Sequence, residues 1–431
     1  MTMRPCAIDL FAGAGGMSLG FEQAGFDVVA AVEIDPIHAA VHKFNFPDCT
    51  VLPESVSGLT GADIRNRAGL GSRSIDLVCG GAPCQGFSMI GKRAIDDPRN
   101  ALVKDFLRIV RELDARAFVF ENVKGLTVGK HRRLLHELIA EFEAAGYDVV
   151  APPRVLNARN FGVPQSRERL FLLGVKKGEQ RPSYPAPLPA GPTCHDALAD
   201  LPEAEDYPEL LQSDAAGNVA WGTPGAYARD MRCLSNAAWH FGYMRDWDRS
   251  LLTSSIRTDH TAITRRRFAE TAPGKVEPIS RLFRLAADGL SNTLRAGTDA
   301  ARGAFTSPRP IHYDRNRCVT VREMARLHGF PDWFRFHQTK WHGARQIGNA
   351  VPPPLARAVA SAMMNALGRV PVRPAASVAL GDPALLRMDM GEAAAFWRVE
   401  RPAGKRDRKS GDVKRRQTDI EALRLAALAA E

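Results

Sequence analysis

The sequence predicts an α/β fold: a doubly wound, mostly parallel sheet with a smaller irregular domain inserted into it. Short apolar runs alternate with segments of helical periodicity over the first 175 residues, and a glycine-rich segment follows the first of these runs. Such alternation is typical of parallel sheets that carry helices on both faces. The alternation stops near residue 176 and regular patterning returns after residue 308, which indicates an insertion between two parts of one fold.

The expected elements follow from these apolar runs and their spacing. Buried parallel strands are predicted at residues 6–11, 28–33, 75–80 and 118–121, with a shorter strand at 50–52. Helices are predicted at 17–24, 36–44, 101–113, 131–145, 321–328 and 354–367. Residues 147–156 and 170–176 are β-rich with no helix between them, so we expect an antiparallel pair at one edge of the sheet.

Changes of composition along the chain indicate its domains. Residues 181–192 contain five prolines and one glycine, which predicts a stiff linker into the insertion. We therefore expect an α/β domain at 1–176, an inserted domain at 177–307, a return to the first domain at 308–368 and a basic, flexible extension at 369–431. Much of the net charge of +10 lies in this extension, and such a balance is compatible with a polyanionic partner.

Composition also excludes several classes of protein. No apolar run approaches the roughly 20 residues that span a bilayer. The first apolar segment is too short for a secretory leader, and the seven cysteines contain no CxxC pair, so we expect a cytoplasmic protein with free thiols. His38 and His42 are spaced i, i+4 on a predicted helix, but no third ligand is evident. We interpret them as two solvated histidines and expect no metal.

A glycine-rich loop, residues 9–17, follows the first predicted strand and opens the first helix. Its glycines allow a sharp turn and close approach of the backbone to a ligand. Glu33 ends the second strand, where a carboxylate can accept from ribose hydroxyls, and Asp63 could accept from an adenine amino group. NAD, FAD and S-adenosylmethionine sites share these features. The pattern Gly13-x-Gly15-Gly16, with Phe11 placed to stack on an adenine, favours S-adenosylmethionine.

A second loop, residues 80–88, follows the strand at 75–80 and contains Cys84. Ligands gather at the carboxyl ends of parallel strands, and a loop rich in proline and glycine is a poor place for a cysteine that only packs in the core. Glu121 ends the strand at 118–121 and is expected at the same edge of the sheet. A cysteine beside an acid suggests covalent catalysis on an electron-poor ring.

Together these segments resemble the bacterial DNA cytosine-C5 methyltransferases. The resemblance covers roughly residues 8–175 and 309–364, and its motifs occur in the family's order. They are Asp9–Phe21, Glu33, Asp63-Ile64, Pro83-Cys84-Gln85, Glu121-Asn122-Val123, Gln165–Arg169, Val321–Asp332 and Gln346–Pro353.

The resemblance implies a Rossmann-like, S-adenosylmethionine-dependent methyltransferase sheet and a covalent mechanism. The Cys84 thiolate would attack C6 of a flipped-out cytosine, and C5 would then take the methyl group from S-adenosylmethionine. Glu121 would hydrogen-bond or protonate N3 of the base, and Arg169 would donate to O2. Arg167 would support Cys84 or the DNA backbone.

The resemblance also implies two sets of binding residues. The cofactor would contact Phe11, Ala12, Gly13, Gly15, Gly16, Glu33, Ile34, Asp63, Ile64, Pro83, Asn349 and Val351. Double-stranded DNA would contact Gln85, Ser88, Arg93, Arg99 and Thr293. The insertion occupies the place of the family's target-recognition domain. There Arg257 and residues 265–267, with three aromatic residues upstream (Trp239, Tyr243 and Trp247), could supply contacts to bases and phosphates.

We therefore expect a monomeric, nucleoid-associated bacterial DNA (cytosine-5-)-methyltransferase, either solitary or paired with a restriction endonuclease that acts on the same site without direct contact. Three alternatives stay open. An NAD-linked oxidoreductase leaves the Cys84 loop unexplained. A tRNA cytosine methyltransferase would carry a Cys-Phe-Thr tripeptide that this sequence lacks. A catalytically inactive DNA-binding homologue is disfavoured by the presence of Cys84 and Glu121.

Overall fold

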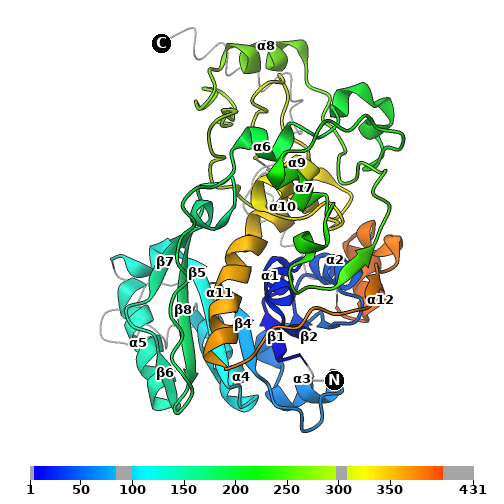
Figure 1. Ribbon diagram of the computed structural model, residues 1–431. Coiled ribbons are helices and arrows are strands. Elements are labelled where there is room, and N and C mark those ends of the chain that lie inside the picture. The colour runs from blue at the N-terminus through cyan, green and yellow to red at the C-terminus, as the bar shows by residue number, and fades with distance from the viewer. Residues whose placement is uncertain (1–3, 84–99, 130, 298–307, 401–431) are drawn as a thin grey trace, which may run out of the picture.

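The computed structural model describes residues 4–83, 100–129, 131–297 and 308–400 (Figure 1). Its centre is an eight-stranded sheet in the order β3-β2-β1-β4-β5-β8-β6, in which β7 also pairs with β8. The strands are β1 Cys6–Leu10, β2 Asp27–Val32, β3 Thr50–Leu52, β4 Leu77–Gly80, β5 Ala117–Val123, β6 Tyr147–Val149, β7 Arg154–Asn157 and β8 Glu168–Lys176. Strands β1 to β5 run parallel, and β8 runs antiparallel to β5, β6 and β7. The predicted fold class and the antiparallel edge are confirmed.

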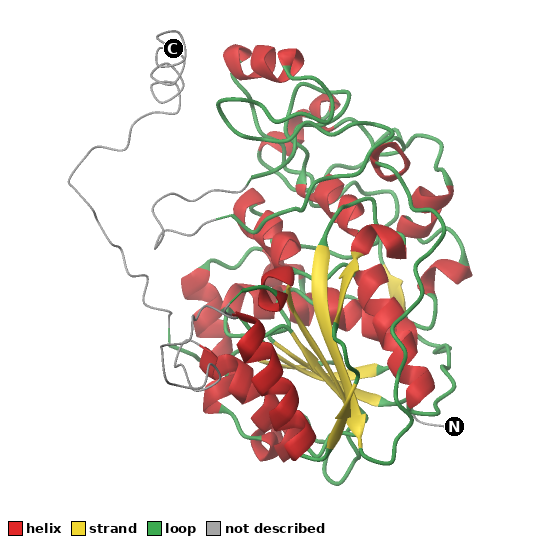
Figure 2. Cartoon of the chain, turned by 90° about the vertical axis from the view of Figure 1, so that its left-hand side faces the viewer, coloured by secondary structure: helices red, strands yellow, loops and turns green. Residues whose placement is uncertain are grey.

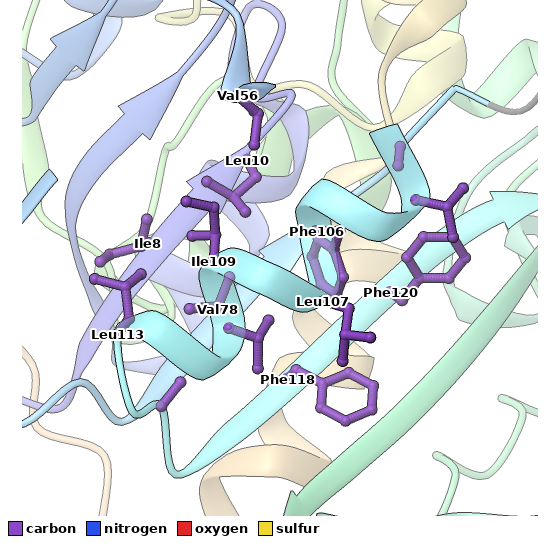
Figure 3. Close-up of a cluster of buried hydrophobic side chains, with 14 of the residues drawn as sticks. Ile8, Leu10, Val56, Val78, Phe106, Leu107, Ile109, Leu113, Phe118 and Phe120 are labelled. Atoms are coloured by element: carbon purple, nitrogen blue, oxygen red, sulfur yellow. The ribbon is translucent and has the colours of Figure 1, made fainter. Parts of the chain in front are cut away.

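Helices cover both faces of the sheet (Figure 2). One face packs against α3 (Gly61–Arg67), α4 (Ala101–Glu112) and α5 (His131–Ala144). The other packs against α1 (Gly16–Ala24), α2 (Pro36–Asn45) and α11 (Pro353–Ala366). Side chains alternate along each strand, so Ile8 and Leu10 face α4 while Ala7 faces α1 and α11 (Figure 3). Both faces are therefore buried, as the near-continuous apolar runs of the strands require.

Helix α11 returns the chain to the start of the fold. It lies beside α1, more than 300 residues away in sequence (Figure 1). It is preceded by α9 (Val321–His328) and α10 (Lys340–Asn349). The start of α9 is a capping box in which Thr320 Oγ1 accepts from the Glu323 amide and the Glu323 carboxylate accepts from the Thr320 amide. These elements confirm the predicted helices at 321–328 and 354–367.

Residues 177–297 of the insertion contain little regular structure. Their longer elements are α6 (Cys194–Leu198), α7 (Ala226–Met231), α8 (Ala262–Glu270) and β9 (Met244–Asp246). Buried arginines of the returning segment join it to this region. Arg326 donates to Asp200 at 3.0 Å and to Asp332 at 2.6 Å, and Arg317 pairs with Glu203 at 2.7 Å and with Glu323 at 2.9 Å.

The chain after α11 differs from the expected flexible extension. Residues 369–400 form β10 (Ser377–Ala379), a 3₁₀ helix (Pro383–Leu386) and α12 (Met390–Trp397), and β10 pairs in parallel with β9. Apolar anchors explain the difference, because Leu385 and Leu386 are buried in the cluster that contains α2 and α9. The basic run at 401–416 lies outside the described residues. No described helix is long and apolar enough to cross a membrane.

Candidate cofactor and catalytic site

A cavity of about 510 Å³ opens at the carboxyl ends of β1, β2, β4 and β5. This is the size of a pocket that holds a small molecule or a cofactor. Its walls come from five segments: the loop after β1, the turn from β2 into α2, the loop after β3, the loop after β4, and the end of α10 with the residues that follow. Leu102 of α4 and Glu121 of β5 complete the lining. The cavity thus joins the two parts of the fold that the insertion separates in sequence.

The loop after β1 forms the floor of the cavity. Phe11, Ala12, Gly13 and Gly16, four of the predicted cofactor contacts, line it. Phe11 has a φ of 62°, a left-handed conformation that is costly for an aromatic residue and is held here at a ligand-sized cavity. Gly16 approaches the backbone of the returning segment so closely that a Cβ would lie 2.5 Å from the Val351 carbonyl oxygen. Gly15 does not line the cavity, because it faces the ring of Phe46 instead.

The turn after β2 forms one wall. Glu33 is buried, and its two carboxylate oxygens accept from the backbone amides of Gly13 at 2.7 Å and Asp35 at 2.8 Å. Burial raises the pKa of Glu33 above its usual value. The side chain of Ile34 is 63% exposed although it belongs to this cavity wall, which leaves an apolar surface available to a ligand.

The structure does not bring Asp63 and Ile64 to the cavity. The carboxylate of Asp63 accepts from Thr60 in the capping box of α3, and Ile64 is fully buried in the core. The positions that line the cavity are Glu54, Ser55 and Val56, directly after β3. These residues could have been predicted from their place after a strand end, where ligands gather. The prediction instead chose Asp63 and Ile64, which lie further along the chain.

Glu121 lines the cavity and pairs with Arg169. The Arg169 Nε lies 3.0 Å from Glu121 Oε1, and both side chains are largely buried. The antiparallel register of β5 and β8 places them on the same face, because Glu121 lies opposite Phe171 and Arg169 lies opposite Val123. Burial raises the pKa of Glu121, and the nearby Arg169 and Arg167 oppose that rise.

The segment that leads to Cys84 is held against β5. Asn122 Nδ2 donates to the Ala82 carbonyl at 2.8 Å, and a Cβ on Gly81 would lie only 2.5 Å from Glu121 Oε2. Pro83, the next residue, lines the cavity. The predicted nucleophile Cys84 and the predicted DNA contacts Gln85, Ser88, Arg93 and Arg99 lie outside the described residues.

Arg167 has a different environment from the one expected of a catalytic residue. Its guanidinium is buried and donates to the backbone carbonyls of Leu294, Gly348 and Ala350 at 2.8–2.9 Å. It does not line the cavity. The side chain instead joins the end of the insertion to the turn between α10 and α11. Asn349, the last residue of α10, and Val351 in that turn are predicted cofactor contacts, and both line the cavity.

Several cavity residues were missed in the sequence. Asp9 is buried and accepts from Ser18 Oγ at 2.6 Å, and burial raises its pKa to about 7. The remaining ones are Ala14, Met17, Val32, Asp35, His38, Gly81, Leu102, Arg345, Gln346 and Ala350, besides Glu54, Ser55 and Val56.

The interpretation of His38 and His42 as solvated is wrong. Both are buried: His38 lines the cavity, and His42 Nδ1 lies 3.4 Å from the Gly13 carbonyl. Their i, i+4 spacing placed them on one helix face, and that face packs under the glycine loop. No group of three or more His, Cys, Asp or Glu side chains in the described part of the chain could hold a metal ion.

Most of the insertion residues considered for DNA contact have structural partners. Trp239 is buried against Trp333, and the Tyr243 hydroxyl donates to Asp27 at 2.9 Å. Arg265 pairs with Glu205 at 2.6 Å, whereas Arg266 is exposed. The others are Trp247, which packs against the cluster around α9, Arg257, whose amide donates to the Leu210 carbonyl, and Arg267, which pairs with Glu277.

Thr293 occupies a different place, at the boundary of the insertion and the sheet. It donates to the Ser166 carbonyl at 2.7 Å and lines a recess of about 140 Å³ with the exposed Arg281 and Arg295. This recess is the part of the insertion where exposed cations and a predicted DNA contact come together.

Comparison with known proteins identifies this arrangement. Residues 6–365 match the C-5 cytosine-specific DNA methylase family. The chain belongs to this family. Type II methyltransferase M.XorII of Xanthomonas oryzae pv. oryzae is 58% identical over 396 residues, which cover 92% of this chain and 93% of the relative. Type II methyltransferase M1.HphI of Haemophilus parahaemolyticus is 33% identical over 365 residues, or 83% and 86% of the two chains.

Solved structures agree with this membership of the C-5 cytosine-specific DNA methylases. A putative DNA modification methyltransferase encoded within an E. coli prophage superposes with a TM-score of 0.69 at 33% identity, covering 85% of this chain and all of that one. The Dnmt2 methyltransferase of S. pombe shares the fold, with a TM-score of 0.51 at 18% identity over 84% of this chain and 99% of that one. The family implies S-adenosylmethionine as methyl donor.

Proposed function

We propose that this chain transfers the methyl group of S-adenosylmethionine to C5 of a cytosine in a specific double-stranded DNA sequence. The observation that carries the proposal is the buried Glu121–Arg169 pair at the cavity, beside the segment that leads to Cys84. The pair offers a carboxyl of raised pKa and a guanidinium side by side, which matches the N3 and O2 edge of a cytosine.

The donor would occupy the cavity. A ligand-sized space with a buried carboxylate at Glu33, an aromatic residue at Phe11 and a glycine floor suits an adenosine with its ribose. The proposal replaces Asp63 and Ile64 by Glu54 and Ser55 as donor contacts. It keeps the other predicted contacts that line the cavity: Phe11, Ala12, Gly13, Gly16, Glu33, Ile34, Pro83, Asn349 and Val351. Gly15 shapes the loop from behind.

The chemistry begins at the base. Attack of the Cys84 thiolate on C6 forms a C–S bond and moves electron density onto C5 and N3, where a protonated Glu121 stabilises it. C5 then takes the methyl group from the donor sulfonium, which leaves as a neutral thioether. Transfer of the C5 proton to a water molecule and elimination of Cys84 as the thiolate restore the aromatic ring. Stacked neighbours block attack from above the ring plane, so the cytosine is rotated out of the duplex.

Arg169 and Arg167 have separate roles in this scheme. Arg169 fixes the orientation of Glu121 and donates to O2 of the base. Arg167 is a positioning residue, because its three carbonyl acceptors join the insertion to the turn that follows Asn349. The insertion would bind the target sequence, with Thr293, Arg281 and Arg295 at the recess facing the DNA and arginine as the usual reader of guanine.

The activity is tested with the Cys84→Ser variant. We expect loss of methyl transfer from labelled S-adenosylmethionine to DNA with little change in binding of S-adenosylhomocysteine, because Cys84 makes a bond only to the base. Wild-type protein should also form a denaturation-resistant complex with DNA containing 5-fluorocytosine, since the fluorine at C5 cannot be removed as a proton. Bisulfite sequencing of DNA from a host that expresses the chain would locate the modified cytosine.

Three outcomes would contradict the proposal. Turnover by Cys84→Ser would exclude the covalent step, and methylation of tRNA without methylation of duplex DNA would favour the RNA alternative. A wild-type chain that binds DNA and donor without transfer would be an inactive homologue. We also propose that the enzyme acts as a monomer at the nucleoid, as the modification partner of a restriction endonuclease. M.XorII and M1.HphI are named Type II methyltransferases, which supports that partnership.

A further inference from the structure

The chain continues past the family match, which ends at residue 365, and its next structured part crosses the molecule. We call residues 377–397 the C-terminal clasp: it comprises β10, the 3₁₀ helix and α12. The clasp begins on the insertion, where β10 pairs with β9 and Ser377 Oγ donates to Asp246 at 3.1 Å. It ends on the cofactor side of the sheet, where α12 packs against α2 (Figure 1).

The clasp contacts α2 at both of its ends. The Gly381 amide donates to the Phe44 carbonyl at 2.9 Å, near the last turn of α2. The Trp397 indole Nε1 donates to the carbonyl of Pro36, the first residue of α2, at 3.1 Å. Between these points, Leu385 and Leu386 are buried in the cluster that includes Val41 and Phe44. The whole length of α2 is therefore fixed by a segment that lies outside the residues matched by the family model.

The clasp also contacts the segment that leads into α10. His337 Nε2 donates to the Met388 carbonyl at 3.0 Å, and the Gln338 amide donates to the Leu386 carbonyl at 2.9 Å. Helix α10 begins at Lys340 and carries Arg345, Gln346 and Asn349 into the cavity wall.

Both elements that the clasp holds are walls of the cavity. The turn into α2 contributes Glu33, Ile34, Asp35 and His38, and α10 contributes Arg345, Gln346 and Asn349. No described residue of the clasp lines the cavity itself. Because the clasp contacts two walls of the cavity but not its interior, it affects a ligand through the position of those walls.

We propose that the C-terminal clasp is a positioning element for the methyl-donor site, and that the Trp397–Pro36 and Gly381–Phe44 contacts set the affinity for the donor. The inference rests on the proposed function, in which the cavity holds S-adenosylmethionine. The clasp fixes the position of α2 relative to α10. The cavity residues on these two elements are therefore already in place before the ligand binds.

The test uses two point variants of the full chain. Trp397→Phe keeps the aromatic bulk and removes the N–H donor, and Gly381→Ala places a Cβ 2.9 Å from Phe44 Cα and forces the clasp away from α2. Trp221→Phe is a matched control, because the Trp221 indole nitrogen is buried and has no hydrogen-bond partner among the residues that the structure describes. The measurements are calorimetric titration with S-adenosylhomocysteine, KM and kcat for S-adenosylmethionine, and thermal unfolding.

We expect each clasp variant to raise the dissociation constant for S-adenosylhomocysteine by about 2- to 10-fold, the worth of one hydrogen bond. The KM for S-adenosylmethionine should rise in parallel, with kcat at saturating donor and DNA affinity unchanged. The control should bind as the wild type does. Unchanged affinity in both folded clasp variants would overturn the inference and leave the clasp a purely stabilising element. A wild-type chain that fails to bind S-adenosylhomocysteine would instead contradict the proposed function.

Discussion

At the scale of single residues, the geometry of Glu121 depends on the absence of a side chain at Gly81. A Cβ there would lie 2.5 Å from Glu121 Oε2, so Gly81→Ala must displace the carboxylate from its place beside Arg169. Because displacement of a catalytic group by about 1 Å costs roughly 100-fold in rate, we expect a single-turnover methyl-transfer rate lower by about that factor. Gly125→Ala is the control, since its nearest neighbour would be Val123 at 3.8 Å. A normal rate in Gly81→Ala would show that Glu121 need not occupy this position.

Asp9 makes the stability of the protein depend on pH. Burial raises its pKa to about 7, whereas the unfolded chain has an ordinary value near 3.9. The folded state therefore holds the proton more tightly, and Asp9 contributes a stability that is complete below about pH 4 and is lost as the pH rises to about 7. The contribution is on the order of 4 kcal/mol, because each unit of pKa shift corresponds to about 1.4 kcal/mol.

The Asp9→Asn variant isolates this contribution, because its amide does not titrate. Urea unfolding of both proteins across this pH range should show the free energy of unfolding of the wild type falling relative to that of the variant. Above about pH 8 the difference should be constant. Parallel curves throughout would mean that folding does not raise the pKa of Asp9, and would contradict the prediction.

At the scale of elements, the sequence predicted what depends on local pattern. The buried strands, the helix at 321–328 and the antiparallel pair at the edge are all consequences of periodicity and neighbouring residues. The place of the cavity was also predictable, because parallel strands end at one edge and so bring Phe11, Glu33 and Glu121 together.

The features whose predicted place or order was wrong depend on contacts between distant segments. The sequence around Asp63 is compatible with a ligand-binding carboxylate and with the last residue of a capping box. The helix that starts at Gly61 shows that Asp63 belongs to a capping box. Arg167 resembles a catalytic arginine in sequence, but its acceptors Leu294, Gly348 and Ala350 lie more than 120 residues away. The sequence of the clasp has only weak hydrophobic periodicity. Its structure depends on Leu385 and Leu386, which pack into a hydrophobic cluster formed by other elements.

At the scale of the whole molecule, the insertion is held to the returning segment by buried charges. Arg326 is fully buried between Asp200 of the insertion and Asp332, with distances of 3.0 and 2.6 Å. Such a pair is a poor source of net stability compared with apolar packing, but the loss of one partner leaves a charge without compensation. The arrangement therefore penalises any movement of the insertion away from α9.

Removal of Asp200 tests this connection. We expect Asp200→Ala to lower the free energy of unfolding by about 3 kcal/mol and to make residues 177–297 more sensitive to limited proteolysis, because Arg326 loses one of its two carboxylates in a buried environment. Glu168→Ala removes a surface pair with Lys124 at 2.9 Å, where both side chains are about half exposed, and should cost less than about 1 kcal/mol. Urea unfolding measures both. If the two variants lower the free energy of unfolding by equal, small amounts, apolar contacts alone hold the insertion in place. If Asp200→Ala increases proteolysis strongly without changing global unfolding, the insertion opens independently of the sheet.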